Sequence, residues 1–336
     1  MKRASVWILL LAAVGAAAFA QARDGRVREL LRARMAQRAD AGVTPVADPD
    51  ARIVQGGDYR FEIEHAGLRR SYRVHVPRSY RPGRPTPLLV ALHGGGGDMD
   101  WQADDAKYGL IGKSERSGFV VAFPNGYSRF PGGRLATWNA GRCCGRARDL
   151  GIDDVGFVRE VVAHVARAVD VDRDRVFATG MSNGGMMAYR LACEASDVFR
   201  AVAPVAGTDN TRECRPSRPV SIAHFHARDD DHVRFDGGAG PGAFRDASAV
   251  TDFTSVPATI AKWSALDGCT VAPRRVLQVP GAYCEVRAGC AGGSKVQLCV
   301  TDRGGHSWPG GRKARGAPPS PSISATDAMW AFFESL

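Results

Sequence analysis

Apolar and polar residues alternate near the start of the chain and follow other patterns further along. Residues 61–65 and 72–76 each carry apolar side chains at alternate positions, and Ala66-Gly67 lies between the two runs. A period of two is typical of a strand with one buried face. We therefore predict an antiparallel hairpin over 61–76.

Short apolar runs follow the hairpin, and helical patterns lie between several of them. The valines between 158 and 169, for example, mark one face of a helix that Asp153 or Asp154 is placed to cap. Strands that alternate with helices predict an α/β fold with a mostly parallel sheet and helices on both faces. The apolar runs lie at 88–92, 119–123, 176–179, 201–205, 220–225 and 296–300, and a closing helix is predicted over 328–333.

The first residues have the pattern of an export signal. Lys2 and Arg3 precede an apolar stretch over 6–19, and Ala18-Phe19-Ala20 offers a small-x-small cleavage site. The alternative is an uncleaved membrane anchor, but the stretch is shorter than the roughly 20 residues that a spanning helix needs. We therefore predict a signal peptide over 1–20 with cleavage near Ala20. The mature protein would be secreted or periplasmic, without a membrane span.

The net charge of +10 is unevenly distributed along the chain. Residues 23–38 hold six arginines against Asp24 and Glu29, so much of the excess lies in one short segment. We predict a basic, partly helical or loose segment over 21–50 and one catalytic domain over 51–336. Because no basic stripe with interleaved aromatic residues follows, binding to nucleic acid is disfavoured.

Eight cysteines agree with export, because an even number in an exported chain indicates disulfides. Sequence alone leaves their connectivity open. The adjacent pair Cys143-Cys144 lacks a second pair at zinc-ligand spacing, so we interpret these cysteines as structural.

One serine has the context of a catalytic nucleophile. Gly180-Met181-Ser182-Asn183-Gly184 lies between the apolar run 176–179 and a helical pattern. A serine at a sharp strand-to-helix turn presents its hydroxyl to a substrate, and the flanking glycines allow the backbone to double back. We predict that Ser182 is the nucleophile of a hydrolase.

A glycine-rich segment follows the apolar run 88–92. His93-Gly94-Gly95-Gly96-Gly97 is placed where such hydrolases complete an oxyanion hole with backbone N–H groups. A nucleotide-binding loop is disfavoured, because Gly-Lys-Ser/Thr does not follow. We predict that the backbones of Gly95 and Asn183 supply the two donors.

A base and an acid are available later in the chain, in the order Ser, Asp, His that this class uses. His306 lies in a glycine-flanked loop after the run 296–300, and residues 229–231 are three aspartates after the run 220–225. Catalytic groups gather at the carboxyl ends of parallel strands. We expect His226, at a strand end, to take part in packing or local hydrogen bonds.

A zinc site is the alternative for this region. His224, His226 and His232 stand near the aspartates, but Arg228 and Asp229 occupy the positions where a zinc-hydrolase pattern has Asp and His. We therefore expect no metal and no organic cofactor.

Several motifs occur together in this chain. They are Leu92-His93-Gly94-Gly95, Trp138 with Cys143-Cys144-Gly145, Asp153-Asp154-Val155-Gly156-Phe157, Gly180-Met181-Ser182-Asn183-Gly184 and Gly305-His306-Ser307-Trp308-Pro309-Gly310. In combination they resemble the polyhydroxybutyrate depolymerase and feruloyl esterase family of α/β-hydrolases, which is like carbohydrate esterase family 1. The resemblance runs from about Tyr59 to the C-terminus.

The resemblance also selects one of the three aspartates. In that family the acid lies in a segment His-Gly-x-x-Asp-x-x-Val-Pro-Tyr, which matches residues 226–235 and selects Asp230. Ala227 and Arg234 depart from the pattern, so Asp229 and Asp231 remain alternatives.

The resemblance implies a secreted serine esterase that acts through an acyl-enzyme, with Ser182, Asp230 and His306 as its triad. Its substrates would be feruloyl or acetyl esters of polysaccharide, or hydroxyacyl esters and oligomers of the polyhydroxybutyrate type. Trp101, Trp138 and Trp308 are candidates for the substrate pocket. Because no binding domain follows the closing helix, we expect soluble esters rather than crystalline polymer.

Two other classes of function stay open. The first is a serine peptidase on the same fold, and the second is a non-catalytic module that binds polysaccharide or polymer. The sequence leaves the oligomeric state undetermined.

Overall fold

The predicted hairpin is formed by strands β1 (Gly57–His65) and β2 (Leu68–Val76), which pair antiparallel with Phe61 opposite Tyr72. They belong to a computed structural model of the protein that describes residues 51–243, 251–313 and 316–336. Phe61, Tyr72, Val74 and Val76 are buried, which is the face that the alternation predicts.

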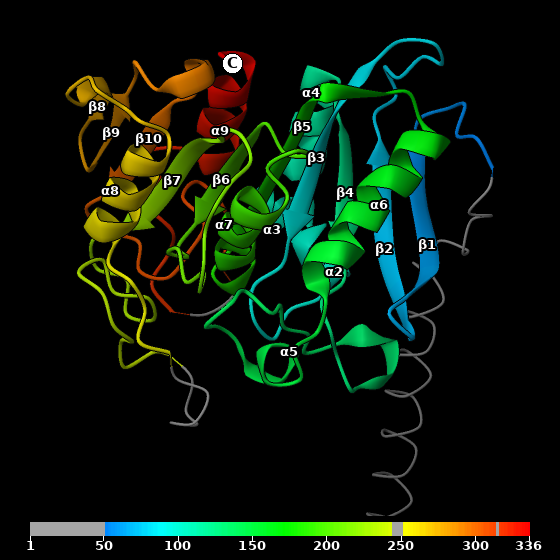
Figure 1. Ribbon diagram of the computed structural model, residues 1–336, viewed down its shortest axis with the longest axis horizontal. Helices are drawn as coiled ribbons and strands as arrows, with labels where there is room; N and C mark the ends of the chain where they lie inside the picture. The colour runs from blue at the N-terminus through cyan, green and yellow to red at the C-terminus, as the bar shows by residue number, and fades with distance from the viewer. Residues whose placement is uncertain (1–50, 244–250, 314–315) are drawn as a thin grey trace, which may run out of the picture. The chain divides into compact units, whose positions relative to one another are not determined.

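A ten-stranded sheet in the described residues has the order β1-β2-β4-β3-β5-β6-β7-β10-β9-β8 (Figure 1). Its centre is parallel, from β4 through β3, β5, β6 and β7 to β10, and the pairs at both edges are antiparallel. The other strands are β3 (Thr86–Leu92), β4 (Val120–Pro124), β5 (Val171–Met181), β6 (Ala201–Val205), β7 (Ser221–Ala227), β8 (Arg274–Val279), β9 (Ala282–Arg287) and β10 (Val296–Thr301).

Helices cover both faces of the sheet, because successive residues of a buried strand point to opposite sides. Val90 and Leu92 of β3 pack in one apolar cluster with α6, α7 and α8, and Leu89 and Ala91 pack in another with α4 and α9. In Figure 1, α6 and α8 lie in front of the sheet. The helices are α2 (Met99–Gln102), α3 (Asp105–Tyr108), α4 (Leu110–Ser117), α5 (Gly145–Asp149), α6 (Asp154–Ala168), α7 (Asn183–Glu194), α8 (Val256–Leu266) and α9 (Ala325–Glu334), with short 3-10 turns η1 (Pro131–Gly133) and η3 (Ala291–Gly293).

The two aspartates at the start of α6 have different roles. The side chain of Asp153 caps the helix by accepting from the N–H of Gly156 at 2.8 Å. Asp154 is buried and forms an ion pair of 2.7 Å with the buried Arg70. Only the first of the two is therefore the cap.

All eight cysteines form disulfides. The pairs are Cys143–Cys144, Cys193–Cys214, Cys269–Cys290 and Cys284–Cys299. Cys284 and Cys299 lie directly opposite each other on β9 and β10, which explains why they pair.

The predicted signal peptide over 1–20 and basic segment over 21–50 lie outside the described residues. Backbone contacts divide the chain into Met1–Pro45 and Val46–Leu336, and every described residue belongs to the second unit. Within the described ranges, no helix combines the length and the apolar character needed to cross a membrane.

Candidate active site

Ser182 lies at the turn between β5 and α7, with a positive φ of 56°. This backbone conformation is unfavourable for a residue with a Cβ, so the surrounding bonds have to impose it. The Ser182 N–H donates to the carbonyl of Val205 at 2.8 Å, and the Ser182 carbonyl accepts from Met186 at 2.9 Å. The turn thus holds Ser182 at the carboxyl edge of the sheet, where it lines a cavity.

The glycines on either side of Ser182 are required by close backbone approach. A Cβ on Gly184 would collide with the carbonyl oxygens of Leu92 and His93, and a Cβ on Gly180 would collide with Gly184. The α7 backbone can therefore pack against the end of β3 only with glycine at these positions.

Residues from two elements that could supply backbone N–H donors line the same cavity as Ser182. In the glycine-rich loop, the N–H of Gly96 donates to Ala136 and that of Gly97 to Gly94, which leaves the N–H groups of Gly94 and Gly95 as candidates. Asn183 is the first residue of α7, so its N–H belongs to the partially positive end of a helix. Gly95 and Asn183 both line the cavity, as an oxyanion hole requires.

The side chain of His93 fixes the glycine-rich loop. Its Nε2 accepts from the N–H of Gly126 at 2.9 Å, so the proton lies on Nδ1, which donates to the carbonyl of Gly94 at 2.8 Å. Burial lowers the pKa of His93 to about 4, so the ring is neutral. This structural role was not predicted from the sequence.

His306 and Asp230 form the charged half of the site. Nδ1 of His306 lies 2.9 Å from Oδ2 and 3.1 Å from Oδ1 of Asp230. Burial by itself raises the pKa of Asp230, but the charge and hydrogen bond of His306, the charge of His226 and the hydrogen bond from the His232 N–H hold that pKa below its usual range. Asp230 is therefore an ionised carboxylate that orients His306.

The neighbouring aspartates do not reach Nδ1 of His306. Asp229 accepts from the N–H of Gly305 at 2.8 Å and so holds the loop that carries His306. Asp231 is exposed and lies 2.8 Å from His232, whose ring stacks on that of His306 with centroids 4.4 Å apart. Asp229 therefore supports the loop of His306, whereas Asp231 faces solvent.

Two of the three histidines of the zinc alternative, His224 and His226, belong to a buried hydrogen-bonded chain. Tyr189 contacts His224 at 2.8 Å, His224 contacts His226 at 3.1 Å, and Nε2 of His226 lies 2.8 Å from the carbonyl of Val233. Burial lowers the pKa of both histidines. His226 thus has the local hydrogen-bonding role that its position predicts.

One group in this site has the spacing of metal ligands. Asp230, His232 and His306 present ligand atoms within 4.8 Å of one another. However, Nδ1 of His306 is bonded to Asp230 and Nδ1 of His232 to Asp231, which fits hydrogen bonding between side chains better than ligation.

The cavity beside Ser182 has a volume of about 530 Å³, and His306 and the glycine-rich loop also line it. Trp101, half exposed, and the buried Trp308 contribute to its wall, and they stay candidates for a substrate pocket. The Lys107 ammonium lies over the Trp101 ring at 4.1 Å. Arg312 and Lys313 add positive charge to the lining.

Trp138 does not line this cavity, so its prediction as a pocket residue was wrong. It is fully buried, and its indole N–H donates to the carbonyl of His93 at 2.9 Å. Its backbone N–H and carbonyl bond to the side-chain amide of Asn183 at 2.7 and 3.0 Å. Trp138 therefore supports the cavity wall from behind.

The sheet order, the Ser182 turn and the Asp230–His306 pair are those of an α/β-hydrolase. The sequence model of the prolyl oligopeptidase family matches residues 117–218, which include Ser182. The fold also resembles that of an acetyl xylan esterase from Aspergillus awamori, with a TM-score of 0.54, 15% identity and coverage of 82% of this chain and 99% of that one.

Curated relatives identify the family within this class. The chain is 32% identical over 271 residues to the putative esterase NocK of Nocardia uniformis subsp. tsuyamanensis, covering 74% of each protein. It is 32% identical over 243 residues to feruloyl esterase B of Piromyces equi, covering 70% of this chain but only 42% of that relative. The chain belongs to the feruloyl esterase-like family of α/β-hydrolases, and these two relatives are both named as esterases.

Proposed function

We propose that the protein is an exported serine esterase that hydrolyses carboxylic esters through an acyl-enzyme, with Ser182, His306 and Asp230 as its triad. The observation that carries this proposal is the meeting of Ser182 and the Asp230–His306 pair at one cavity. The named esterases among its relatives support the same reaction.

The hydrogen bond between Asp230 and Nδ1 of His306 leaves Nε2 as the ring nitrogen that can act as the base. Nδ1 of His306 faces Asp230, so Nε2 takes the proton of Ser182 as its oxygen attacks the ester carbonyl. The negative oxygen of the tetrahedral intermediate accepts hydrogen bonds from the N–H groups of Gly95 and Asn183. His306 then protonates the leaving alcohol, and water repeats the sequence on the acyl-enzyme.

Two substrate classes remain within this proposal. Relatives named feruloyl esterase and bifunctional acetylxylan esterase/xylanase favour feruloyl or acetyl esters of plant polysaccharide. The motif resemblance adds esters and oligomers of 3-hydroxybutyrate. A cavity of about 530 Å³ with Trp101 in its wall has room for an aromatic or a short acyl group.

A peptidase is the second candidate, because the family model that matches residues 117–218 is that of prolyl oligopeptidases. The experiment is a rate comparison of wild type and Ser182→Ala on methyl ferulate, acetylated xylan, 3-hydroxybutyrate oligomers and a matched peptide anilide. We expect ester hydrolysis that Ser182→Ala lowers by about 10⁴-fold or more while the fold is retained. Faster cleavage of the anilide would establish the peptidase, and an inactive wild type would favour a binding module.

Export is the part of the proposal that rests on residues 1–20 and on the disulfides. Disulfides persist mainly in oxidising compartments, which supports a secreted or periplasmic location. N-terminal sequencing of the mature protein from its natural host tests this. We expect a start near Gln21, and an intact Met1 or Lys2 would contradict it.

A further inference from the structure

The disulfide between Cys143 and Cys144 differs from the other three in what it encloses. A disulfide stabilises a fold mainly by restricting the unfolded chain, and the gain increases with the number of residues between its cysteines. The other pairs are separated by 15 or 21 residues, whereas Cys143 and Cys144 are adjacent. Restriction of the unfolded chain therefore does not explain this disulfide.

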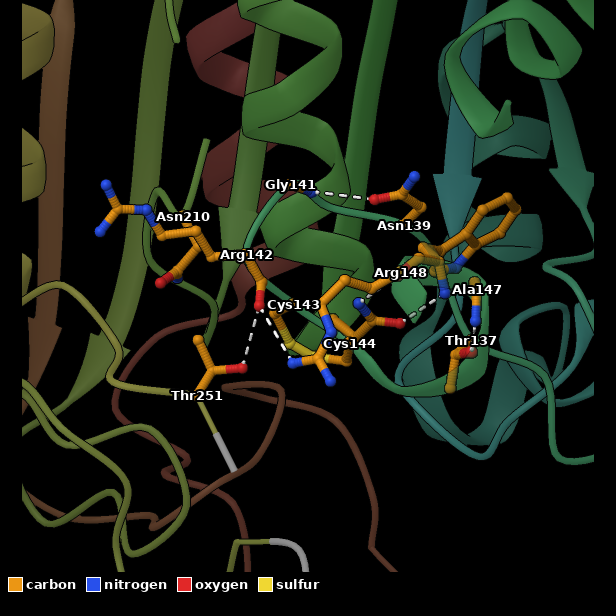
Figure 2. Close-up of a disulfide and its surroundings, with 12 residues drawn as sticks. Thr137, Asn139, Gly141, Arg142, Cys143, Cys144, Ala147, Arg148, Asn210 and Thr251 are labelled. Carbon is orange, nitrogen blue, oxygen red and sulfur yellow. Dashed lines mark hydrogen bonds between the residues drawn. A yellow bond between two sulfur atoms is a disulfide. The ribbon is translucent and has the colours of Figure 1, made fainter. Parts of the chain in front are cut away.

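On one side of this disulfide, hydrogen bonds hold the backbone of the preceding residue, Arg142. Figure 2 shows Thr251 and Arg148 converging on the carbonyl of Arg142, at 3.2 and 3.3 Å. The N–H of Arg142 donates to the carbonyl of Asn210 at 2.9 Å. The residue that precedes the disulfide is thus held from three separate segments of the chain.

On its other side the disulfide connects to the proposed oxyanion hole. Cys144 lines the cavity that contains Ser182, and its N–H donates to the carbonyl of Trp138 at 3.1 Å. That same carbonyl accepts from the side chain of Asn183, and the Trp138 indole donates to the carbonyl of His93. His93 and Asn183 belong to the two segments that supply the proposed donors.

We propose that the Cys143–Cys144 disulfide is a positioning element of the oxyanion hole. By fixing the turn over 138–144, it holds Trp138 against Asn183 and His93 and so sets the spacing of the Asn183 and Gly95 N–H groups. This proposal rests on the proposed serine esterase function. It assigns the disulfide to transition-state stabilisation and not to substrate binding or global stability.

The experiment compares two double variants on an ester that the wild type hydrolyses. Cys143→Ala/Cys144→Ala removes the adjacent disulfide, and the matched control Cys269→Ala/Cys290→Ala removes one that does not line the cavity. We expect the first variant to lower kcat about tenfold or more while KM stays within about threefold of wild type. Its affinity for phenylboronic acid, which forms a tetrahedral adduct with the serine, should fall by the same factor. The control should lower Tm and leave kcat unchanged.

An unchanged kcat in Cys143→Ala/Cys144→Ala would overturn the proposal, as would a loss confined to KM. If this variant fails to fold, Asn183→Ala breaks the same connection at its other end with the disulfide intact. It should lower kcat in the same way, and wild-type kcat in Asn183→Ala would also overturn the proposal. The proposed function would fail separately, through an inactive wild type or an active Ser182→Ala.

Discussion

The two sides of the cavity are built from different kinds of interaction. On the nucleophile side, β3, the β5–α7 turn and the turn over 138–144 are joined by neutral bonds, such as those between Asn183 and the Trp138 backbone. On the acid–base side, the loops after β7 and β10 bring together the ionisable groups Asp230, His232 and His306. One side fixes shape, and the other carries charge and a proton.

The two sides differ most clearly in one histidine each, the buried His93 and the partly buried His306. His93 is neutral, since burial lowers its pKa to about 4, and it only holds a loop. His306 faces Asp230, whose pKa lies below its usual range although burial alone would raise it. We therefore expect shape-changing substitutions to affect the first side most, and charge-changing ones the second.

The largest expected effect is a loss of kcat in variants of Ser182 and His306. Combining the two substitutions tests whether the two sides of the cavity act as one catalytic unit. His306→Ala should lower kcat by about 10⁴ to 10⁶-fold, close to the effect of Ser182→Ala, because the serine is activated only by its base. The double variant should be no slower than either single one. Steady-state kinetics on a soluble ester measures all three.

Additive losses in that double variant would show that Ser182 and His306 act independently, against the proposed triad. Circular dichroism of each variant serves as the control for folding.

Asp230→Asn should come next, with kcat lowered by about 10³ to 10⁴-fold, because a neutral amide neither orients His306 correctly nor stabilises its charged form. The matched control is Asp231→Asn, one residue further on and exposed, which should stay within about threefold of wild type. If Asp231→Asn lost more activity than Asp230→Asn, the assignment of the acid would be wrong.

On the nucleophile side, Gly184→Ala should destabilise the fold by about 3 kcal/mol, because its Cβ would overlap the carbonyls of Leu92 and His93. Gly57→Ala is the control, since a Cβ there meets only the Tyr59 side chain at ordinary distance. Urea denaturation gives both values. Equal stabilities of the two variants would contradict the close packing of α7 against β3.

The smallest expected effect concerns how stability depends on pH. Asp267, a buried carboxylate without a histidine partner, serves as the reference for Asp230. Burial raises the pKa of Asp267 to about 6, above its value in the unfolded chain. Its ionisation therefore disfavours the folded state, and stability should be lost as pH rises from about 4 through 6. The loss should be about 1–2 kcal/mol after allowance for solvent screening.

Asp267→Asn should abolish that loss, so its unfolding free energy relative to wild type should rise between pH 4 and 7. Asp230→Asn should show the opposite trend, because the lowered pKa of Asp230 stabilises the fold at neutral pH and this contribution fades as the pH falls through that pKa. Parallel urea titrations at several pH values check both signs. The same pH trend in both variants would contradict the opposite pKa shifts of Asp267 and Asp230.

The sequence by itself determined the elements that have a clear period. Alternation predicted β1 and β2, uniform apolar runs predicted the central strands, and the context of Ser182 predicted its strand-to-helix turn. It missed β8 and β9. β8 is an exposed edge strand without alternating burial, so its sequence carries no clear period. β9 does alternate, with Ala282, Cys284 and Val286 buried, so its period of two was a signal that the sequence prediction did not use.

Only the tertiary structure decided which distant residues meet. Three consecutive aspartates look alike in sequence, yet the turn after β7 directs Asp230 to His306, Asp229 to the Gly305 backbone and Asp231 to solvent. Contacts between separate segments likewise pair Cys193 with Cys214 and place Trp138 behind the wall of the cavity. These outcomes depend on how loops from separate strands pack together. The local pattern of residues does not determine such packing.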